Sequence, residues 1–132
     1  MTLSEVNVLV GRSDWGWAEA VSKIFAPRGV NSIVAADAAV ALDIIQRRRI
    51  HTAIVDMDSE PASGLSIIKV IHGYYPMVPC ILLSLCAEEG LLAKALELNV
   101  FSVIAKPVDM SILQDQLNRL FIKRYNSRIF DG

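Results

Sequence analysis

Short apolar runs alternate along this chain with longer segments in which apolar residues recur every three or four positions. The short runs are rich in β-branched and aliphatic residues, as strands buried on both faces usually are. They predict strands at Val6–Val10, Asn31–Ala35, Thr52–Asp56, Cys80–Ser84 and Ser102–Ala105. The periodic segments predict a helix after every strand.

Each predicted helix has one apolar face. The residues expected on these faces are, helix by helix, Trp17, Val21, Ile24 and Phe25; Ala38, Ala41, Leu42 and Ile45; Ile67, Ile68 and Ile71; Leu91, Leu92, Ala95 and Leu96; and Leu113, Leu117, Leu120 and Phe121. Asp14 and Asp37 stand where N-caps are expected, because a short carboxylate accepts hydrogen bonds from first-turn amides. Pro27 and Gly29 are expected to end the first helix, and Asn99 fits a left-handed C-terminal cap.

Apolar strands joined by helical crossovers indicate a parallel sheet with helices on both faces. The predicted fold class is therefore α/β, a doubly wound sheet of five parallel strands. A chain of 132 residues with a hydrophobic fraction of 53% is enough for one domain with a continuous core. We place this domain at residues 1–122 and treat residues 123–132 as a C-terminal tail or the start of a linker.

Composition narrows the possible partners. The formal net charge of −1 gives no electrostatic case for nucleic acid or an anionic membrane, and Arg47–Arg49 fits a solvated helix end. No apolar run reaches the roughly 18 residues of a membrane span, and no signal-peptide pattern opens the chain, so a cytoplasmic location is expected. Cys80 and Cys86 form no CxxC and have no nearby histidine, so no metal site is expected there.

Reactive side chains stand at the ends of three predicted strands. Asp56 ends the third, Ser84 ends the fourth, and Lys106 directly follows the fifth. Doubly wound sheets bind ligands at the carboxyl ends of their strands. A carboxylate, a hydroxyl and an ammonium group at one edge therefore predict an anion or phosphoryl site.

With these residues in place, the chain from about Val8 to Phe121 resembles the receiver domains of two-component response regulators. The stretch AIVDMDSEPASGLSII is similar to the family's phosphoacceptor segment, which implies phosphorylation of Asp56. The stretch VPCILLSL is similar to the strand that supplies a phosphoryl-binding hydroxyl, here Ser84. The stretch VIAKPVD carries the family's Lys-Pro pair, which implies that Lys106 contacts the phosphoryl group and that a cis bond precedes Pro107.

The resemblance also implies a strand order of 2-1-3-4-5 and a role in phosphorelay signalling rather than enzymatic turnover. The implied partner is a sensor histidine kinase or another signalling protein. Homodimers of such domains use the fourth helix, the fifth strand and the fifth helix.

One corner departs from the family pattern. Receivers hold magnesium with a pair of acidic residues at the end of the first strand, where this chain has Gly11 and Arg12. The charges of Arg12, Asp56 and Lys106 sum to about +1, against about −2 in a pocket of three carboxylates and one lysine. We therefore expect no dedicated metal site. Asp14 and Asp58 are the candidate replacement carboxylates, and Asp58 together with Asp56 would bind magnesium weakly. The alternative for Asp14 is a helix cap, and the alternative for Asp58 is a solvated loop residue.

Two further features bear on signalling. In the fifth strand, Val103 stands where the family has an aromatic residue that relays phosphorylation, and Phe101 either compensates from the same face or packs. Pro61 lies five residues after Asp56 rather than four. Near the site, Trp17 fits the buried helix face, whereas Trp15 either packs or stands exposed beside the pocket.

Three functional hypotheses follow. The first is a receiver that is phosphorylated on Asp56, atypical because Arg12 replaces part of the metal's charge. The second is a receiver-like interaction module that works without phosphorylation because Arg12 neutralises Asp56. The third is a flavodoxin-like ligand-binding enzyme. It has the least support, because the phosphate-loop glycine spacing at Gly11 continues with Trp17 instead of lysine.

Overall fold

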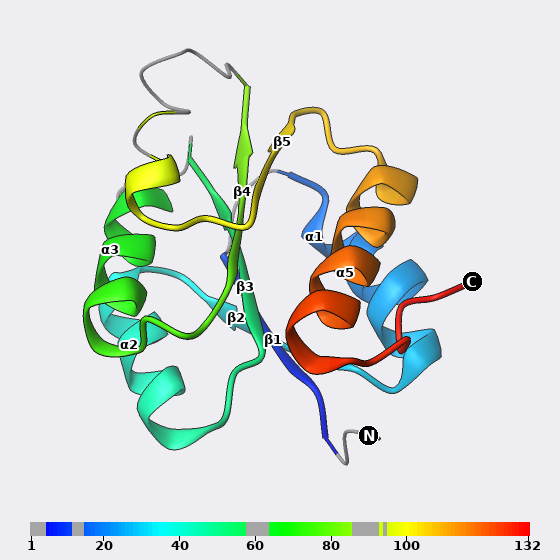
Figure 1. Cartoon of the computed structure of the whole chain (residues 1–132), viewed down its shortest axis with the longest axis horizontal. Helices are drawn as coiled ribbons and strands as arrows, with labels where there is room; N and C mark the ends of the chain where they lie inside the picture. The colour runs from blue at the N-terminus through cyan, green and yellow to red at the C-terminus, as the bar shows by residue number, and fades with distance from the viewer. Residues whose placement is uncertain (1–4, 12–14, 58–63, 86–92, 94) are drawn as a thin grey trace.

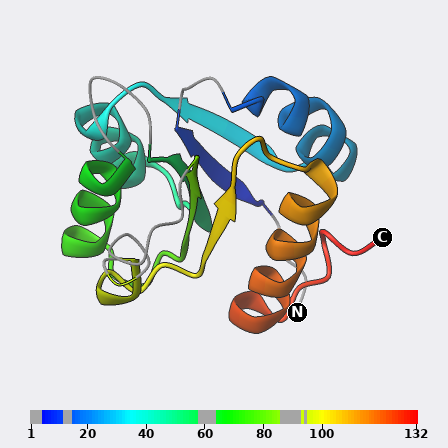
Figure 2. The same ribbon diagram turned by 90° about the horizontal axis from the view of Figure 1, so that it is seen from above.

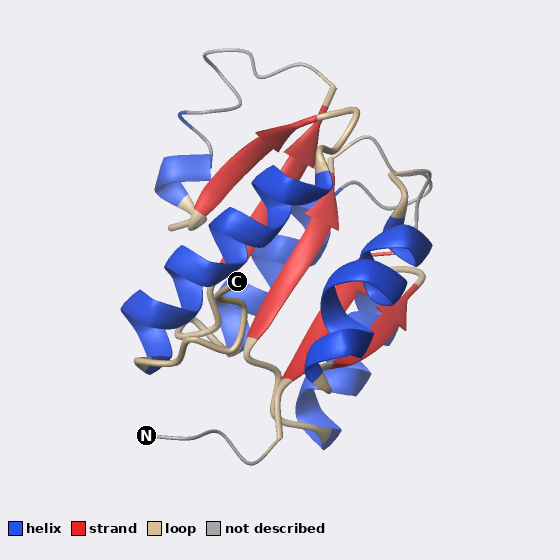
Figure 3. Cartoon of the chain, turned by 90° about the vertical axis from the view of Figure 1, so that its right-hand side faces the viewer, coloured by secondary structure: helices blue, strands red, loops and turns tan. Residues whose placement is uncertain are grey.

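The structure is a computed structural model that describes residues 5–11, 15–57, 64–85, 93 and 95–132. It contains one sheet with the strand order β2-β1-β3-β4-β5, as predicted (Figure 1). The strands are β1 (Asn7–Gly11), β2 (Asn31–Ala35), β3 (Thr52–Asp56), β4 (Cys80–Ser84) and β5 (Ser102–Ala105). All pair in parallel, so their carboxyl ends lie at one edge of the sheet (Figure 3).

The predicted strand ranges are confirmed for β2 to β5, and β1 lies one residue later than expected. β1, β3 and β4 are buried at every position. Complete burial explains why each of these strands is apolar along most of its length, as the interior strands of a parallel sheet are.

Helices cover both faces of the sheet (Figures 1 and 2). One face carries α2 (Ala38–Arg47) and α3 (Gly64–Tyr74). The other carries α1 (Trp17–Ala20), which continues as a π-helical turn (Val21–Phe25) and a 3₁₀ turn (Ala26–Arg28), and α5 (Met110–Tyr125). Much of the predicted fourth helix lies outside the described residues. Within it Ala95 is buried as expected, but Leu96 is 79% exposed, so its predicted place in the core is wrong.

The local signals for helix ends are mostly confirmed. Asp37 caps α2 by accepting a hydrogen bond from the Val40 amide at 2.9 Å. Gly29 ends the first helical segment with φ 68°, and Asn99 adopts φ 55°. The predicted cap at Asp14 is wrong, because the helix begins after Gly16, whose φ of 87° suits glycine. Asp14 itself lies outside the described residues.

Two hydrophobic clusters form the core, one on each face of the sheet. The cluster under α1 and α5 includes an aromatic group from the end of the chain. The Phe130 ring packs edge-on against Phe121 and Phe25, with ring centroids 4.8 Å and 6.0 Å apart. α5 also continues past Ile122 to Tyr125. The tail thus contributes to the core, whereas its use as a linker stays a prediction.

Among the residues that the structure describes, no helix combines the length and the apolar character that crossing a bilayer requires.

Candidate functional site

The three reactive residues predicted from sequence meet at the carboxyl edge of the sheet. Asp56 of β3 lies opposite Leu83 of β4, and Ser84 lies opposite Ala105 of β5. The Lys106 amide extends this ladder by donating to the Ser84 carbonyl at 2.9 Å. The strand register therefore fixes the backbone positions of all three side chains relative to one another.

An ion pair joins two of these residues. The Lys106 Nζ lies 2.8 Å from Oδ1 of Asp56 and 2.9 Å from Oδ2. The Asp56 side chain has no exposed surface, and that of Lys106 is 10% exposed. Both carboxylate oxygens thus accept from one ammonium group in a region with little water, where charges interact more strongly than at a surface.

The neighbouring side chains make this edge chemically specific. The Ser84 side chain is buried at the end of the adjacent strand, and it supplies a hydroxyl donor. The peptide bond between Lys106 and Pro107 is cis, as the resemblance implied. A carboxylate, a hydroxyl and an ammonium group therefore stand at neighbouring strand ends at the carboxyl edge of the sheet.

The corner after β1 is built around Trp15. Its indole Nε1 donates to the Gly11 carbonyl at 3.0 Å, and the side chain is 5% exposed. The alternative in which Trp15 stands exposed beside the pocket is therefore wrong. Trp17 is only partly buried and packs against the edge of the core. The helix starts two residues later than the predicted cap implied.

Gly11 does not owe its identity to crowding. A Cβ added there would lie 3.5 Å from the Ile54 carbonyl and 3.6 Å from the Val55 Cα, which are ordinary van der Waals distances. A Cβ at this position is therefore compatible with the sheet.

Several predicted site residues cannot be placed. Arg12, Asp14, Asp58 and Pro61 lie outside the described residues. In the described ranges, no group of three or more His, Cys, Asp or Glu side chains is arranged to hold a metal ion.

Val103 and Phe101 pack on opposite faces of the sheet. Val103 packs with the cluster under α2 and α3, whereas Phe101 packs with the cluster under α1 and α5. Phe101 precedes the first residue of β5, so the strand alternation that would place it on the face of Val103 does not apply. The expectation of a shared face is wrong, and Phe101 has a packing role.

Comparison with known proteins identifies a family and several relatives of this chain. A model of the response regulator receiver domain matches residues 14–118. The chain is 26% identical over 119 residues to an NtrX-like response regulator of Rickettsia bellii, covering 89% of this chain and 25% of that protein. It is 22% identical to the sporulation initiation phosphotransferase F of Bacillus subtilis, covering 86% of this chain and 91% of that protein.

A solved structure agrees in fold. The CheY-like receiver domain protein from Methanospirillum hungatei JF-1 superposes with a TM-score of 0.82 at 19% identity, covering 93% of this chain and 98% of that chain. The present chain spans about a quarter of the length of the NtrX-like regulator. Because the family match covers most of the chain and includes Asp56, Ser84 and Lys106, the chain belongs to the response regulator receiver domain family.

Proposed function

We propose that this receiver domain accepts a phosphoryl group on Asp56 and does so with little help from magnesium. The observation that carries the proposal is the buried ion pair between Asp56 and Lys106 beside Ser84. In the proposed step, an Asp56 carboxylate oxygen attacks the phosphorus of a phosphohistidine. The P–N bond breaks, its electron pair leaves with the imidazole, and an acyl phosphate forms on Asp56.

Lys106 and Ser84 would hold the transferred group. The ammonium group of Lys106 would move from the carboxylate to the phosphoryl oxygens, and the hydroxyl of Ser84 would donate to another of these oxygens. Fixed donors of this kind stabilise charge that develops on the phosphoryl group. The donor partner is a sensor histidine kinase or a small phosphodonor.

Magnesium is the group that receivers of this family use, and the residues in place do not fit it well. The strand-end positions that carry the acidic pair are Gly11 and Arg12 here. Two unit charges about 4 Å apart interact by about 4 kcal/mol at an effective dielectric of 20. Replacing a carboxylate by arginine therefore turns an attraction for the magnesium ion into a repulsion of similar size. Asp58 and Asp14 are the candidate replacement carboxylates in the sequence. We therefore expect slow transfer in which Arg12 supplies part of the missing positive charge.

A second candidate is an interaction module that does not need phosphorylation. The observation that favours it is that Lys106 engages both oxygens of an Asp56 side chain with no exposed surface. If Arg12 adds a second cation, the carboxylate is neutralised permanently and the domain holds one conformation. No observation described above supports the third hypothesis, a flavodoxin-like enzyme, and the family match points to signalling instead.

The candidate contact surface of such a module lies along β5 and α5. β5 is an edge strand, and a shallow cavity of about 380 Å³ lies beside it, lined in part by Val103, Ile104 and Pro107. Ile112 of α5 is 49% exposed at this cavity, and the buried Ser102 Oγ has no hydrogen-bond partner among the residues that the structure describes. These features support a protein partner or a second copy of the chain at this surface.

The test uses Trp15, whose indole is bonded to the carbonyl at the end of β1. A Trp17→Phe variant leaves Trp15 as the sole indole, and its fluorescence is titrated with beryllium fluoride, which stands in for a phosphoryl group, with and without magnesium. Intact mass after incubation with acetyl phosphate gives the covalent readout. A saturable change and added phosphoryl mass, both absent in Asp56→Asn, are expected. No change in either readout would favour the phosphorylation-independent module.

The role of the β1 corner is tested by restoring the acidic pair. The spacing around Gly11 admits a Cβ, so Gly11→Asp with Arg12→Asp should fold and should bind magnesium more tightly than the parent. Gly11→Asn with Arg12→Asn is the matched control, since it has the same shape without the negative charge. Equal magnesium affinity in the parent and the restored variant would mean that Gly11 and Arg12 do not determine metal binding.

A further inference from the structure

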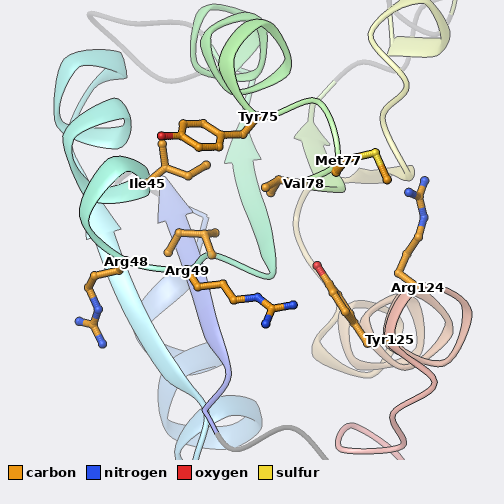
Figure 4. Close-up of a pocket in the computed structure, with 9 residues that line it drawn as sticks. Ile45, Arg48, Arg49, Tyr75, Met77, Val78, Arg124 and Tyr125 are labelled. Atoms are coloured by element: carbon orange, nitrogen blue, oxygen red, sulfur yellow. The ribbon is translucent and has the colours of Figure 1, made fainter. Parts of the chain in front are cut away.

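A cavity of about 380 Å³ lies at the opposite edge of the sheet from Asp56 (Figure 4). Its walls come from the end of α2 with the residues that follow it, from the loop between α3 and β4, and from the end of α5. The first two segments lead into the amino ends of β3 and β4, whereas Asp56 lies at a carboxyl end. The volume falls in the range of about 300 to 1,000 Å³ that is usual for small-molecule sites.

The rim of this cavity is cationic. Arg48, Arg49 and Arg124 line it, and no acidic residue does. Arg48 is held by Glu5 at 3.1 Å and turns away from the cavity. Within the part of the chain that the structure describes, no ion pair holds Arg49 or Arg124. Two guanidinium groups from segments 75 positions apart in the sequence therefore stand at the rim of one cavity with no ion-pair partner among the described residues.

Attraction to the carboxyl end of α2 does not explain the position of Arg49. It lies two residues beyond the last residue of α2, and the attraction of a cation to a helix end falls off within the last turn. Figure 4 shows its side chain reaching toward Tyr125, while Arg124 rises beside Met77. Burial raises the pKa of Tyr125, whereas Arg49 and Arg124 lower it, so both cations lie within electrostatic reach of this phenol.

The inner surface of the cavity is apolar and aromatic. Ile45 and Ile50 are buried at its base, and the rings of Tyr75 and Tyr125 are partly buried at its sides. The Tyr125 hydroxyl donates to the His51 carbonyl, which fixes the ring in place. Met77 is 80% exposed at the mouth, where an adaptable thioether is open to contact.

We propose that this cavity binds a small organic anion. The aromatic or aliphatic body of the ligand packs on the isoleucines and the tyrosine rings, and its carboxylate, sulfonate or phosphate group pairs with Arg49 and Arg124. Charge-assisted hydrogen bonds from guanidinium groups suit these planar or tetrahedral anions. The site is separate from the phosphoryl chemistry at Asp56 and gives the domain an input for a diffusible molecule.

The first test uses two fluorescent probes that share their fused rings. 8-Anilinonaphthalene-1-sulfonate carries an anion, and N-phenyl-1-naphthylamine does not. Arg49→Gln with Arg124→Gln should weaken binding of the sulfonate about tenfold, because charged hydrogen bonds are lost, and should change binding of the neutral probe little. Titrations at 0.15 M salt limit long-range charge effects to about 8 Å.

A matched variant controls for total charge. Arg47→Gln with Arg119→Gln removes two exposed arginines of α2 and α5 that pair with Asp43 and Asp115 and do not line the cavity. This variant should bind the sulfonate as the parent does. Equal weakening in both double variants, or equal loss of both probes, would overturn the proposal. Asp56→Asn should leave sulfonate binding unchanged, so this test stands apart from that of phosphorylation.

Competition then distinguishes two kinds of natural ligand. Adenosine monophosphate presents a phosphate on an aromatic base, and octanoate presents a carboxylate on an aliphatic chain. Displacement of the sulfonate probe by the nucleotide alone would assign the cavity to aromatic phosphates, and displacement by octanoate alone to fatty carboxylates. Displacement by neither would overturn the proposal for small organic anions.

Discussion

At the scale of single residues, the buried pair of Asp56 and Lys106 dominates the site. Lys106 is within hydrogen-bond distance of both carboxylate oxygens, and neither side chain is open to water to any large extent. A pair of this kind contributes little net stability compared with two apolar residues, but losing one partner leaves an uncompensated buried charge. The two residues are therefore energetically coupled.

This coupling gives a stability prediction. Lys106→Met should lower the free energy of unfolding by about 3 to 5 kcal/mol, since the buried Asp56 carboxylate would lose its ammonium partner. Adding Asp56→Asn to this variant should recover most of the loss, because no charge remains to be compensated. Urea denaturation at neutral pH measures both effects.

An exposed pair provides the control. Lys23 and Glu19 lie 2.9 Å apart on the surface, with side chains 66% and 49% exposed. Lys23→Met should cost at most about 1 kcal/mol. A cost for Lys106→Met as small as that for Lys23→Met would mean that water reaches Asp56 and that the pair is not tightly coupled.

At the scale of elements, periodicity predicted strands better than it predicted helix starts. β2 to β5 have the ranges read from sequence. In β3 and β4, complete burial leaves a continuous apolar run that ends at a polar residue. The first helix differs, since a left-handed Gly16 delays its start and a π-helical turn at Val21–Phe25 changes its phase. A 3.6-residue repeat anticipates neither feature, so it left open whether Trp15 packs or stands exposed, and Trp17, expected on the buried face, is only partly buried.

The candidate sites differ in the same way. Asp56, Ser84 and Lys106 were predictable because each follows directly on an apolar strand, and strand ends of a parallel sheet share one edge. The cavity near Arg49 and Arg124 was not predictable, because its residues come from three separate loops or helix ends. Sequence periodicity says nothing about how such ends approach one another. The neighbouring arginines at 47–49 were the only available signal, and they also fit a solvated helix end.

The C-terminal tail is an element with a testable contribution. Phe130 is 1% exposed and contacts rings of Phe25 and Phe121, and Gln114 donates to its carbonyl at 3.2 Å. Phe130→Ala should lower the free energy of unfolding by about 3 to 5 kcal/mol, because it removes a fully buried ring. Thermal or urea unfolding checks this. Arg128→Ala, at an exposed position of the same tail, should change stability little, and equal effects would mean that the tail does not pack as described.

At the scale of the whole molecule, the Asp56 site lies at the carboxyl ends of the strands, and the cavity lined by Arg49 and Arg124 lies near their amino ends. His51 also lies near the amino ends, directly before β3, and is 2% exposed. Its Nδ1 accepts from the Asn7 amide at 3.2 Å, and its ring stacks on Phe121. Burial lowers the pKa of His51 below its ordinary value of 6.5, and the nearby Arg49 lowers it further.

His51 makes the stability of the domain depend on pH. Because the folded pKa is lowered, the unfolded chain binds a proton first as the pH falls below 6.5. The contribution of neutral His51 is therefore complete above pH 6.5 and decreases as the pH falls toward the folded pKa. Urea midpoints measured between pH 7.5 and 5 should decrease. A His51→Asn variant keeps a side-chain acceptor for Asn7, and it should show a shallower slope; an identical slope would exclude His51 as the source.

The closed geometry of Asp56 has a consequence for kinetics. Since the Asp56 side chain has no exposed surface and Lys106 engages both of its oxygens, the pair has to open before a phosphodonor can react. Opening is a first-order event within the domain, whereas encounter with the donor is second order. At low donor concentration the proposed phosphorylation of Asp56 should rise in rate with the donor, and at high concentration it should reach a plateau set by how often the pair opens. The maximum speed of such a receiver is thus a property of its own fluctuations, whichever donor it meets.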